Sequence, residues 1–342
     1  MMKTIKLGMI GLGGMGNHHA AILSKMPGVE IVGVCDLIEE KAKKLGEQLN
    51  VPWYLDYHQL LGSCEAVWVC TEPFNRRDIV LTCAKEKKHI FTEKPVASAL
   101  NDAEAMVEAT SAAGVIYMLG YCLRFMNPFQ MIHKIYASGE LGELVDCWTR
   151  RYMPYDMSNL WYGWQKNSGG VMLDFGSHDI DWLRWIGGDV HAVSGFVRTV
   201  RPTMHADEHG RALLHFVNGG VGSVSDSWSS YLSDCSIGVV GTRGAVIVDR
   251  DGTLRKRVGD GDEEIFRDQS AVDVNPQGDI GKKDEKGKIQ LIESVEETIQ
   301  EHFFRCIREQ SVPITAGSEG LKTLMTVLAL QKSSQTGQTV CV

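Results

Sequence analysis

Residues 4–26, TIKLGMIGLGGMGNHHAAILSKM, contain the pattern that decides the fold. The run at 4–10 is apolar and partly β-branched, which predicts a buried strand, and residues 17–26 predict a helix. Between them lies GLGGMG, a complete GxGxxG. In such a unit the first glycine permits a tight turn, the second lets the backbone approach a pyrophosphate, and the third lets the helix pack closely on the strand. The helix N-terminus supplies N–H donors and a positive dipole end. We therefore predict a dinucleotide site formed by Gly11, Leu12, Gly13, Gly14, Met15 and Gly16.

An acidic residue follows the second apolar run. Residues 30–35, EIVGVC, end at Asp36, twenty residues after Gly16. A carboxylate at this position accepts hydrogen bonds from the adenosine ribose hydroxyls and repels a 2′-phosphate. Residues 37–39 offer no cation to hold such a phosphate. The pattern predicts NAD rather than NADP as the cofactor, and the alternative is a glycine turn that binds no ligand.

Strand and helix patterns continue to alternate up to residue 121. This alternation predicts a doubly wound, parallel Rossmann sheet, with ligands at the carboxyl ends of its strands. The expected strands are 65–70, 89–93 and 115–121, and the expected helices are 75–87 and 101–114.

Two strand ends carry further candidate cofactor-binding residues, which are Thr71, Pro73, Glu93, Lys94 and Pro95. Lysines usually lie on protein surfaces, so position alone leaves surface and functional roles for Lys94 equally open. The adjacent proline stiffens the loop and restricts where the lysine points.

The remainder of the chain predicts a second α/β domain, with the boundary between residues 1–122 and 123–342. Sequential strands with tight turns, including the NGG hairpin at 218–220, indicate a large, open, mainly antiparallel sheet. Residues 268–288 form a polar loop, and the last two helices are expected to close the chain, packing back on the N-terminal domain. A sheet with one uncovered face needs a partner, which predicts a homo-oligomer. The expected strands are 144–153, 191–200, 210–217, 221–228, 235–242 and 244–249, and the final helices are 292–310 and 317–335.

The composition excludes several classes of function. The 342 residues are 44% hydrophobic and 23% charged, which is ordinary for a globular protein long enough for two domains. The formal charge of −8 argues against a nucleic-acid partner. No stretch approaches the roughly 18 apolar residues of a membrane span, and no basic run suggests a membrane surface. Nine scattered cysteines, several within apolar runs, favour a reducing cytoplasm.

Two further segments carry titratable side chains. In GGVMLDFGSHDID, residues 169–181, a helix would place Asp174 and His178 on one face, one turn apart. They form either a proton-transfer pair or an ordinary helix start with an acid in its first turn. Residues 205–215, HADEHGRALLH, enter a predicted strand, where a spacing of four has no helical meaning. We predict a loop there and no metal site.

Taken together, these motifs resemble the glucose–fructose oxidoreductase/inositol dehydrogenase (Gfo/Idh/MocA) family. The resemblance spans nearly the whole chain. It rests on GLGGMG, Asp36, EKP at 93–95, RFMNP at 124–128, GELGEL at 139–144, SGGVMLDFGSHDID at 168–181, GTRG at 241–244 and QTGQTV at 335–340. It implies a Rossmann domain, a C-terminal α/β domain whose open sheet mediates a homodimer or homotetramer, and NAD(P)-dependent oxidation or reduction of a secondary alcohol on a sugar or cyclitol.

The resemblance also implies roles for three catalytic residues. Lys94 matches the lysine of the EKP motif, and Asp174 and His178 match the acid and the histidine of a D-x-G-x-H motif. His178 would take the hydroxyl proton, since imidazole titrates near neutrality. Lys94 would stabilise negative charge on the same oxygen, and Asp174 would orient the substrate or the imidazole.

Two departures from the family pattern leave questions open. Many members have T-P-x-x-x-H where this chain has TEPFNRR, so Arg76 or Arg77 takes the place of a histidine. Members often have W-R-x-D where this chain has WYGWQKNSGG. Trp161 and Trp164 could stack on the C–H faces of a sugar ring or aglycone, or could be packing residues. Arg124 is a candidate substrate contact, although fixing the domain junction is the favoured role.

The leading function is thus an NAD-dependent dehydrogenase of a sugar, sugar derivative or inositol. One alternative is a redox-assisted glycosidase, in which transient oxidation lets a glycosidic bond eliminate and NAD is regenerated. Another is a non-catalytic regulator that senses NAD or a sugar. Retention of Lys94, Asp174 and His178 together argues against the regulator, which needs no proton-transfer set.

Overall fold

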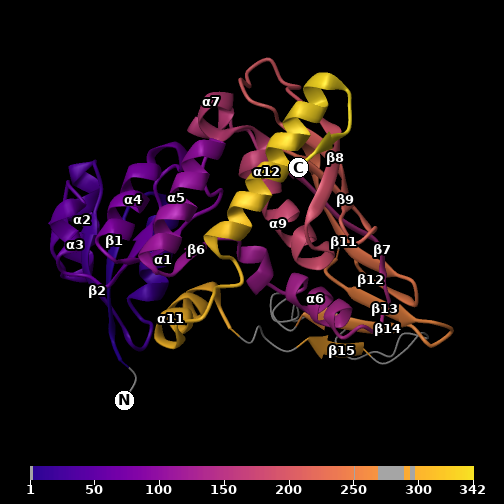
Figure 1. Cartoon of the computed structure of the whole chain (residues 1–342), viewed down its shortest axis with the longest axis horizontal. Helices are drawn as coiled ribbons and strands as arrows, with labels where there is room; N and C mark the ends of the chain where they lie inside the picture. Colours follow the sequence, from indigo (N-terminus) through magenta and orange to yellow (C-terminus); the bar gives the residue numbers. More distant parts are fainter. Residues whose placement is uncertain (1–2, 250, 269–288, 293–296) are drawn as a thin grey trace. The chain divides into compact units, whose positions relative to one another are not determined.

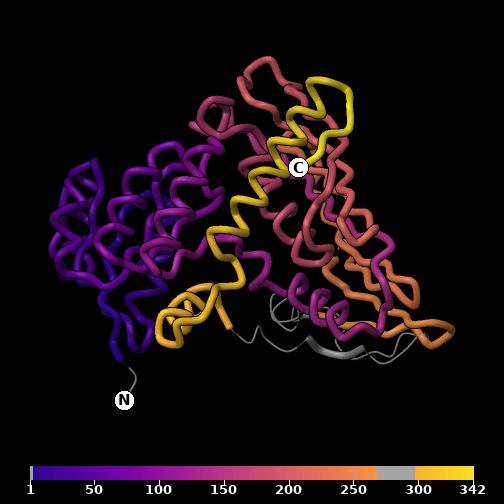
Figure 2. The backbone as a smooth tube through the Cα atoms, in the orientation of Figure 1, coloured from indigo at the N-terminus to yellow at the C-terminus, as the bar shows by residue number. Residues whose placement is uncertain are grey.

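The computed structural model describes residues 3–249, 251–268, 289–292 and 297–342, and its chain divides into two compact units (Figure 1). Unit 1 comprises Met1–Tyr121 and Glu297–Leu321, and unit 2 comprises Cys122–Glu296 and Lys322–Val342. The path of the chain in Figure 2 can be followed from unit 1 into unit 2, back to unit 1 over residues 297–321, and again into unit 2.

Unit 1 contains a six-stranded, wholly parallel sheet with the strand order β3-β2-β1-β4-β5-β6. The predicted Rossmann fold is confirmed. The strand order reverses between β1 and β4, and in such sheets ligands bind at this switch point, beyond the carboxyl ends of the strands. The strands are β1 Ile5–Ile10, β2 Val29–Cys35, β3 Trp53–Tyr54, β4 Ala66–Val69, β5 His89–Thr92 and β6 Tyr117–Leu119.

The helices of unit 1 connect these strands and cover the sheet. Right-handed crossovers place α1 on one face and α4 and α5 on the other. α1 begins at Gly14, three residues earlier than predicted, because the end of the glycine turn already forms its first turn. The helices are α1 Gly14–Leu23, α2 Glu39–Leu49, α3 His58–Leu61, α4 Arg77–Lys85, α5 Leu100–Ala113 and α11 Ile299–Glu309, with the 3₁₀ turn η1 at Pro73–Asn75.

Aromatic packing joins the returning segment to the sheet of unit 1. Trp68 on β4 and Phe91 on β5 stack with ring centres 3.6 Å apart. Phe303 on α11 packs edge-on against both, 5.5 Å from Trp68 and 5.9 Å from Phe91. Thr298 starts α11 with a capping box, in which its side chain accepts from the Glu301 N–H and the Glu301 carboxylate accepts from the Thr298 N–H. The start at Ile299 rather than near residue 292 follows from this cap.

Unit 2 contains a ten-stranded sheet with the order β15-β14-β13-β12-β11-β7-β10-β9-β8-β16. The sheet is mainly antiparallel, as predicted, and among the strands that the structure describes only the β7–β10 and β14–β15 pairs are parallel. The NGG segment joins the antiparallel pair β9 and β10. Most of the predicted polar loop, residues 269–288, lies outside the described residues. The strands are β7 Leu144–Pro154, β8 Val190–Arg198, β9 His209–Phe216, β10 Val221–Ser227, β11 Ser229–Gly241, β12 Gly244–Val248, β13 Leu254–Val258, β14 Glu264–Asp268, β15 Ile289–Ile292 and β16 Val340–Cys341.

Helices cover one face of this sheet (Figure 1). α9 contacts β7 and β10, and α6 contacts β11 and β12. On β9, side chains alternate between buried and exposed, so Arg211, Leu213 and His215 form part of the other face. None of the helices described here is long and apolar enough to cross a membrane. The helical elements of unit 2 are η2 Cys122–Phe125, α6 Phe129–Ala137, η3 Trp161–Gly163, α7 Gln165–Ser168, α8 Val171–Asp174 and α9 Gly176–Gly187; α12 Gly317–Thr336 crosses the unit boundary between Leu321 and Lys322.

Candidate active site

The GLGGMG turn in unit 1 combines very close backbone packing with open space. Gly11 has φ +84°, and a Cβ atom there would lie 2.8 Å from the Thr71 nitrogen. A Cβ on Gly16 would lie 2.1 Å from the Gly11 carbonyl oxygen. Gly13 and Gly14 have no neighbouring atom within 4 Å of such a Cβ. The turn therefore requires glycine for packing at its ends and leaves its middle accessible to a phosphate. Leu12 is buried within the turn and Met15 is exposed.

The Asp36 carboxylate is held next to this turn. One of its oxygens accepts from the Leu12 N–H at 2.7 Å, and the other accepts from the Ile38 N–H at 2.9 Å. A carboxylate has about four acceptor positions, so two remain for the hydroxyls of a ribose. Leu37, immediately after it, is 88% exposed and offers an apolar surface of the kind that covers an adenine ring.

Two arginines could take the place of the histidine in the family's T-P-x-x-x-H pattern, and they lie in different environments. The Arg77 side chain is 45% exposed and forms ion pairs with Asp78 and Asp102. Arg76 is only 1% exposed, and its guanidinium donates to backbone carbonyls, including that of Thr71 at 2.7 Å. Arg76 is therefore the residue that enters the interior at this strand end. Pro73, in the turn just before it, is buried.

The loop that follows β5 is bonded to α1 and α11. Oε1 of Glu93 lies 2.7 Å from Nε2 of His19, and the Lys94 N–H donates to the other Glu93 oxygen at 3.3 Å. The Gln300 amide nitrogen lies 3.1 Å from Nδ1 of His19. A neutral imidazole that accepts from Gln300 and donates to Glu93 satisfies all three groups. Glu93 is thereby fixed beside Lys94, and Pro95 after it is buried.

Asp174 and His178 lie in unit 2, on two short helical segments instead of the single helix that we expected. α8 ends at Asp174 and α9 begins at Gly176. In the first turn of α9, the His178 N–H donates to the Phe175 carbonyl, only three residues back, at 3.3 Å. Asp174 is 8% exposed. His178 is half-buried, and its Nδ1 lies 3.9 Å from Sγ of Cys122.

Two buried ion pairs hold the helix that carries His178. Nε of Arg124 donates to Asp181 Oδ2 at 2.7 Å, and Nη2 donates to Oδ1 at 2.8 Å. This bidentate pair anchors Arg124 within unit 2, and its roles at the domain junction and as a substrate contact stay predictions. Arg151 on β7 pairs with Asp179, next to His178 in the chain, and Nε donates to it at 2.9 Å.

A second carboxyl group lies close to the Arg151–Asp179 pair. Asp226 on β10 is fully buried, and neither of its oxygens has a hydrogen-bond partner among the described residues. Burial, reinforced by the charge of Asp179, raises the pKa of Asp226 well above its usual range. Folding therefore favours the protonated form of Asp226 relative to the unfolded chain.

The predicted aromatic substrate contacts are both packed on other rings. Trp161 stacks on Tyr162 with ring centres 3.8 Å apart, and Trp164 stacks on His205 at 4.3 Å. Trp164 remains 44% exposed and can still present a ring edge or face to a ligand. In the neighbouring 205–215 segment, Glu208 is fully buried and pairs with Arg201 at 2.5 Å. Within the described ranges, no three His, Cys, Asp or Glu side chains gather as a metal site.

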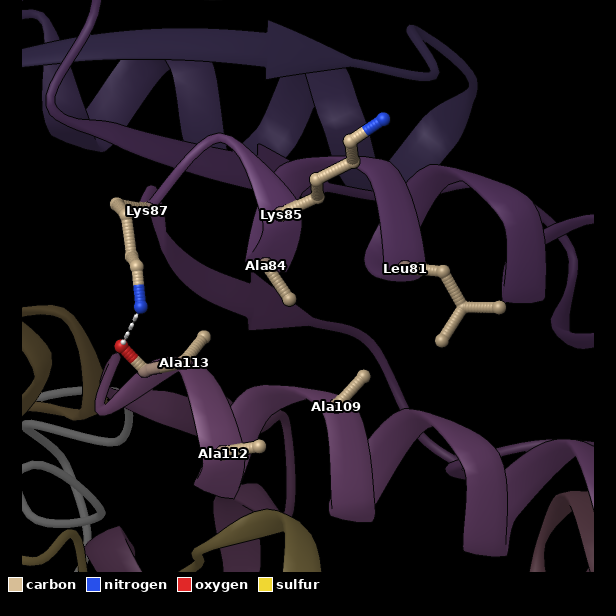
Figure 3. Close-up of a pocket in the computed structure, with 7 residues that line it drawn as sticks. All are labelled: Leu81, Ala84, Lys85, Lys87, Ala109, Ala112 and Ala113. Carbon is tan, nitrogen blue, oxygen red and sulfur yellow. Dashed lines mark hydrogen bonds between the residues drawn. The ribbon is translucent and has the colours of Figure 1, made fainter.

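A hollow between α4 and α5 lies away from these residues (Figure 3). It is lined by Leu81, four alanines and two lysines, and Lys87 donates to the Ala113 carbonyl at 2.9 Å. It contains no acid, imidazole or thiol, so it is a gap between two helices with no evident chemistry.

Two domain matches identify the family. Residues 5–121 match the NAD-binding Rossmann-fold domain of the Gfo/Idh/MocA oxidoreductases, and residues 129–247 match the C-terminal domain of the same group. The chain belongs to the Gfo/Idh/MocA family. It is thus an NAD-binding oxidoreductase, and the resemblance inferred from the motifs is confirmed.

Known relatives match this oxidoreductase over its full length. Myo-inositol 2-dehydrogenase of Thermotoga maritima is 27% identical, with 98% of each chain covered. D-apiose dehydrogenase of Rhizobium rhizogenes is 26% identical over 99% of this chain and 98% of its own. Among solved structures, an oxidoreductase from Agrobacterium radiobacter in complex with NAD+, L-tartaric acid and magnesium superposes with a TM-score of 0.85. It is 22% identical, covering 99% of this chain and 98% of its own, so this likeness speaks for the fold alone.

The residues of unit 1 fit a bound NAD. The middle of the glycine turn is open, and Asp36 retains acceptor positions next to it. The Thr71 hydroxyl is buried, and no hydrogen-bond partner for it lies among the described residues. A buried hydroxyl at a strand end needs a partner, which a polar ligand would provide.

Three residues near the carboxyl ends of the parallel strands were not predicted from the sequence. They are His19, Arg76 as a buried hydrogen-bond donor, and Gln300. His19 gave a signal, because an imidazole in the apolar stretch after GLGGMG is unusual. Gln300 gave none, since it lies 281 residues from His19 in the chain.

Proposed function

We propose that this oxidoreductase transfers a hydride between NAD and a secondary hydroxyl of a sugar, a sugar derivative or an inositol. The observation that carries the proposal is the setting of Lys94. Arg76 bonds the backbone on both sides of Lys94 and also bonds Thr71, and the Thr71 nitrogen packs directly on Gly11. Lys94 therefore belongs to the same sheet edge as the glycine turn. The names of the inositol and apiose dehydrogenases among the relatives support a polyol substrate.

The residues that would hold NAD follow from unit 1. The N–H groups at the start of α1 and the open glycines would bind the pyrophosphate, and Asp36 would bind the adenosine ribose. Like-charge repulsion from Asp36 disfavours the 2′-phosphate of NADP. When bound, NAD supplies the hydride acceptor, and the protein supplies orientation and charge.

The proton chemistry is assigned to three side chains. His178 accepts the proton of the reacting hydroxyl, because a half-buried imidazole can exchange protons near neutral pH. Lys94 donates a hydrogen bond to the same oxygen and stabilises its developing negative charge. Asp174 ends α8, four residues before His178 in the chain. It orients the substrate or the imidazole and favours the cationic imidazole.

We test this function by incubating the purified protein with NAD and a panel of polyols. The panel contains myo-inositol, scyllo-inositol, D-apiose, free hexoses, uronates, amino sugars and aryl glycosides, and NADH formation is followed by its absorbance. Growth of NADH with one compound is the expected result and names the substrate class.

Two other outcomes would replace the proposal. Release of an aglycone from a glycoside without net NADH would identify the redox-assisted glycosidase. Tight NADH binding without turnover of any compound would identify a regulator that senses its ligands. The exposed Trp164 ring suits a glycoside as well as a free sugar, so the aryl glycosides belong in the first experiment.

We also propose that the protein forms a homodimer or homotetramer through the uncovered face of the unit 2 sheet, as the family resemblance implies. Phe196 on β8 and Leu213 on β9 are 46% and 49% exposed on neighbouring strands. Leu213→Glu should lower the mass measured by light scattering to that of a smaller species, and an unchanged mass would exclude this face.

We further propose that the protein works in the reducing cytoplasm. Burial raises the pKa of the Cys35 and Cys83 thiols to about 12, which keeps them as protonated thiols, and such free thiols suit a reducing compartment.

A further inference from the structure

Arg76 is buried in unit 1 and bonds several segments of backbone at once. Its guanidinium donates to the carbonyl oxygens of Glu93, Pro95 and Val96 on the loop after β5, and to that of Thr71 after β4. The carbonyl groups of Glu93 and Pro95 flank Lys94 on both sides. One rigid, planar cation thus connects two strand ends and fixes the peptide groups around Lys94.

This arrangement is costly as a purely structural device. Among the described residues no carboxylate oxygen bonds to the Arg76 guanidinium, and Glu93 instead bonds His19. A buried cation without a bonded counter-ion loses its hydration for carbonyl partners alone, and apolar side chains often replace such groups without loss of stability. Burial lowers the pKa of Arg76, but an arginine remains charged at any physiological pH. Placement of this cation beside a candidate catalytic lysine points to a role in function.

The backbone of Lys94 is held from two directions. Arg76 holds the carbonyl groups on either side of it, and the Glu93 carboxylate accepts from the Lys94 N–H while it is bonded to His19. The Pro95 ring further restricts the chain. The backbone of Lys94 is therefore fixed before its ammonium group engages a hydroxyl.

We propose that Arg76 is a positioning residue for the reaction: its guanidinium fixes the Glu93–Val96 loop against Thr71 and thereby sets where the Lys94 ammonium group acts. This inference rests on the proposed function, since it needs Lys94 to act on the substrate. In this proposal, Arg76 takes the place of the histidine that many family members have after β4. A histidine has two ring nitrogens and cannot bond carbonyl groups on both strand ends, whereas the five N–H donors of arginine can.

The test compares Arg76→Met with the matched control Arg308→Met. Arg308 also lies in unit 1 and donates to a backbone carbonyl, that of Gly28, at 2.9 Å. Gly28 precedes β2, at the amino edge of the parallel sheet, opposite the candidate site. Arg76→Lys is the second variant; it keeps the charge but cannot reach all four carbonyl groups. Amide hydrogen exchange of Lys94 and Val96 is measured in each purified variant, together with NADH affinity and melting temperature.

Turnover is then measured with NAD and myo-inositol, or with the panel compound of highest turnover, in Arg76→Met, Lys94→Met and the double variant. We expect exchange at Lys94 and Val96 to rise at least about tenfold in Arg76→Met and less in Arg76→Lys, with no change in Arg308→Met. The kcat of Arg76→Met should fall about 10- to 100-fold, with KM changed less, because a displacement of about 1 Å at a reacting group has that effect. The double variant should be no slower than Lys94→Met alone, since both substitutions remove one function.

Each contrary outcome has a separate meaning. Unchanged exchange at Lys94 and Val96 in Arg76→Met would overturn the inference irrespective of activity. Raised exchange with full turnover, while Lys94→Met is slow, would also overturn it. Full turnover in Lys94→Met would refute the role proposed for Lys94, on which this inference rests, whereas absence of wild-type turnover with every panel compound would refute the proposed function. If Arg76→Met does not fold, Arg76→Lys gives the same comparison, because it retains the buried charge.

Discussion

Three alanine substitutions in the GLGGMG turn should have three different effects. Gly16→Ala places a Cβ 2.1 Å from the Gly11 carbonyl oxygen, whereas real contacts of this kind essentially never fall below 3.0 Å. The neighbour is backbone, so α1 or the turn must move by about 0.9 Å. Overpacking of this kind costs about 1–3 kcal/mol, which lowers the melting temperature by roughly 2–10 °C. The displaced turn should also weaken NADH binding about 10- to 100-fold.

Gly13→Ala and Gly14→Ala serve as the comparison, because neither Cβ would meet a protein atom within 4 Å. Gly13→Ala should melt like the wild type yet bind NADH at least about tenfold more weakly, since its methyl group takes the space of the pyrophosphate. Gly14 is a variable position of GxGxxG that would bind the phosphate through its backbone N–H, which alanine retains, so Gly14→Ala should leave both properties nearly unchanged. Differential scanning fluorimetry and NADH fluorescence titration measure the two quantities. Wild-type stability and affinity in Gly16→Ala would refute the packing argument, and wild-type affinity in Gly13→Ala would refute the placement of the pyrophosphate.

Three further predictions concern charge and proton transfer. Asp36→Ala should reduce the preference for NAD over NADP about tenfold or more, because it removes the repulsion of a 2′-phosphate; an unchanged ratio of the two dissociation constants would argue against the ribose contact. His178→Ala should lower kcat about 100-fold or more while NADH affinity stays within about twofold. The control His191→Ala removes an exposed imidazole of the same unit and should keep full turnover. Asp226 has a pKa that is raised on folding, so its stabilising contribution is complete below the unfolded pKa near 4 and is lost as pH rises toward the folded pKa. In urea titrations, the unfolding free energy of Asp226→Asn should therefore rise relative to that of the wild type as pH increases from about 4 toward the folded pKa, with a slope of up to about 1.4 kcal/mol per pH unit. A pH-independent difference would show that Asp226 is ionised when folded.

The features that could be predicted from sequence are those that depend on neighbours in the chain. The strand, glycine turn and helix at residues 4–26 and the acid at Asp36 form one local unit, and the family match and fold bear out its type. Strands β13 and β14 escaped prediction because their charged sequences, such as LRKRV, do not alternate as half-buried strands do. They are strands because β12 and each other provide hydrogen-bond partners.

The candidate active site, like the strands, could be predicted only where it depends on neighbours in the chain. Lys94, Asp174 and His178 were nominated from motifs, but their surroundings depend on distant residues. Gln300 follows the Cys122–Glu296 part of unit 2 in the chain, and the local sequence around His19 carries no trace of their contact. The break at Phe175 was missed because residues on both sides of it favour helix.

The return of residues 297–321 to unit 1 has a consequence for synthesis on the ribosome. Trp68 and Phe91 are made early, but Phe303 on α11, which packs against both, is made more than two hundred residues later. During translation this apolar surface stays uncovered while residues 122–296 of unit 2 are added, so the nascent chain is most exposed to aggregation and to chaperone capture in that interval. A fragment that stops at Tyr121 would be left permanently in that state.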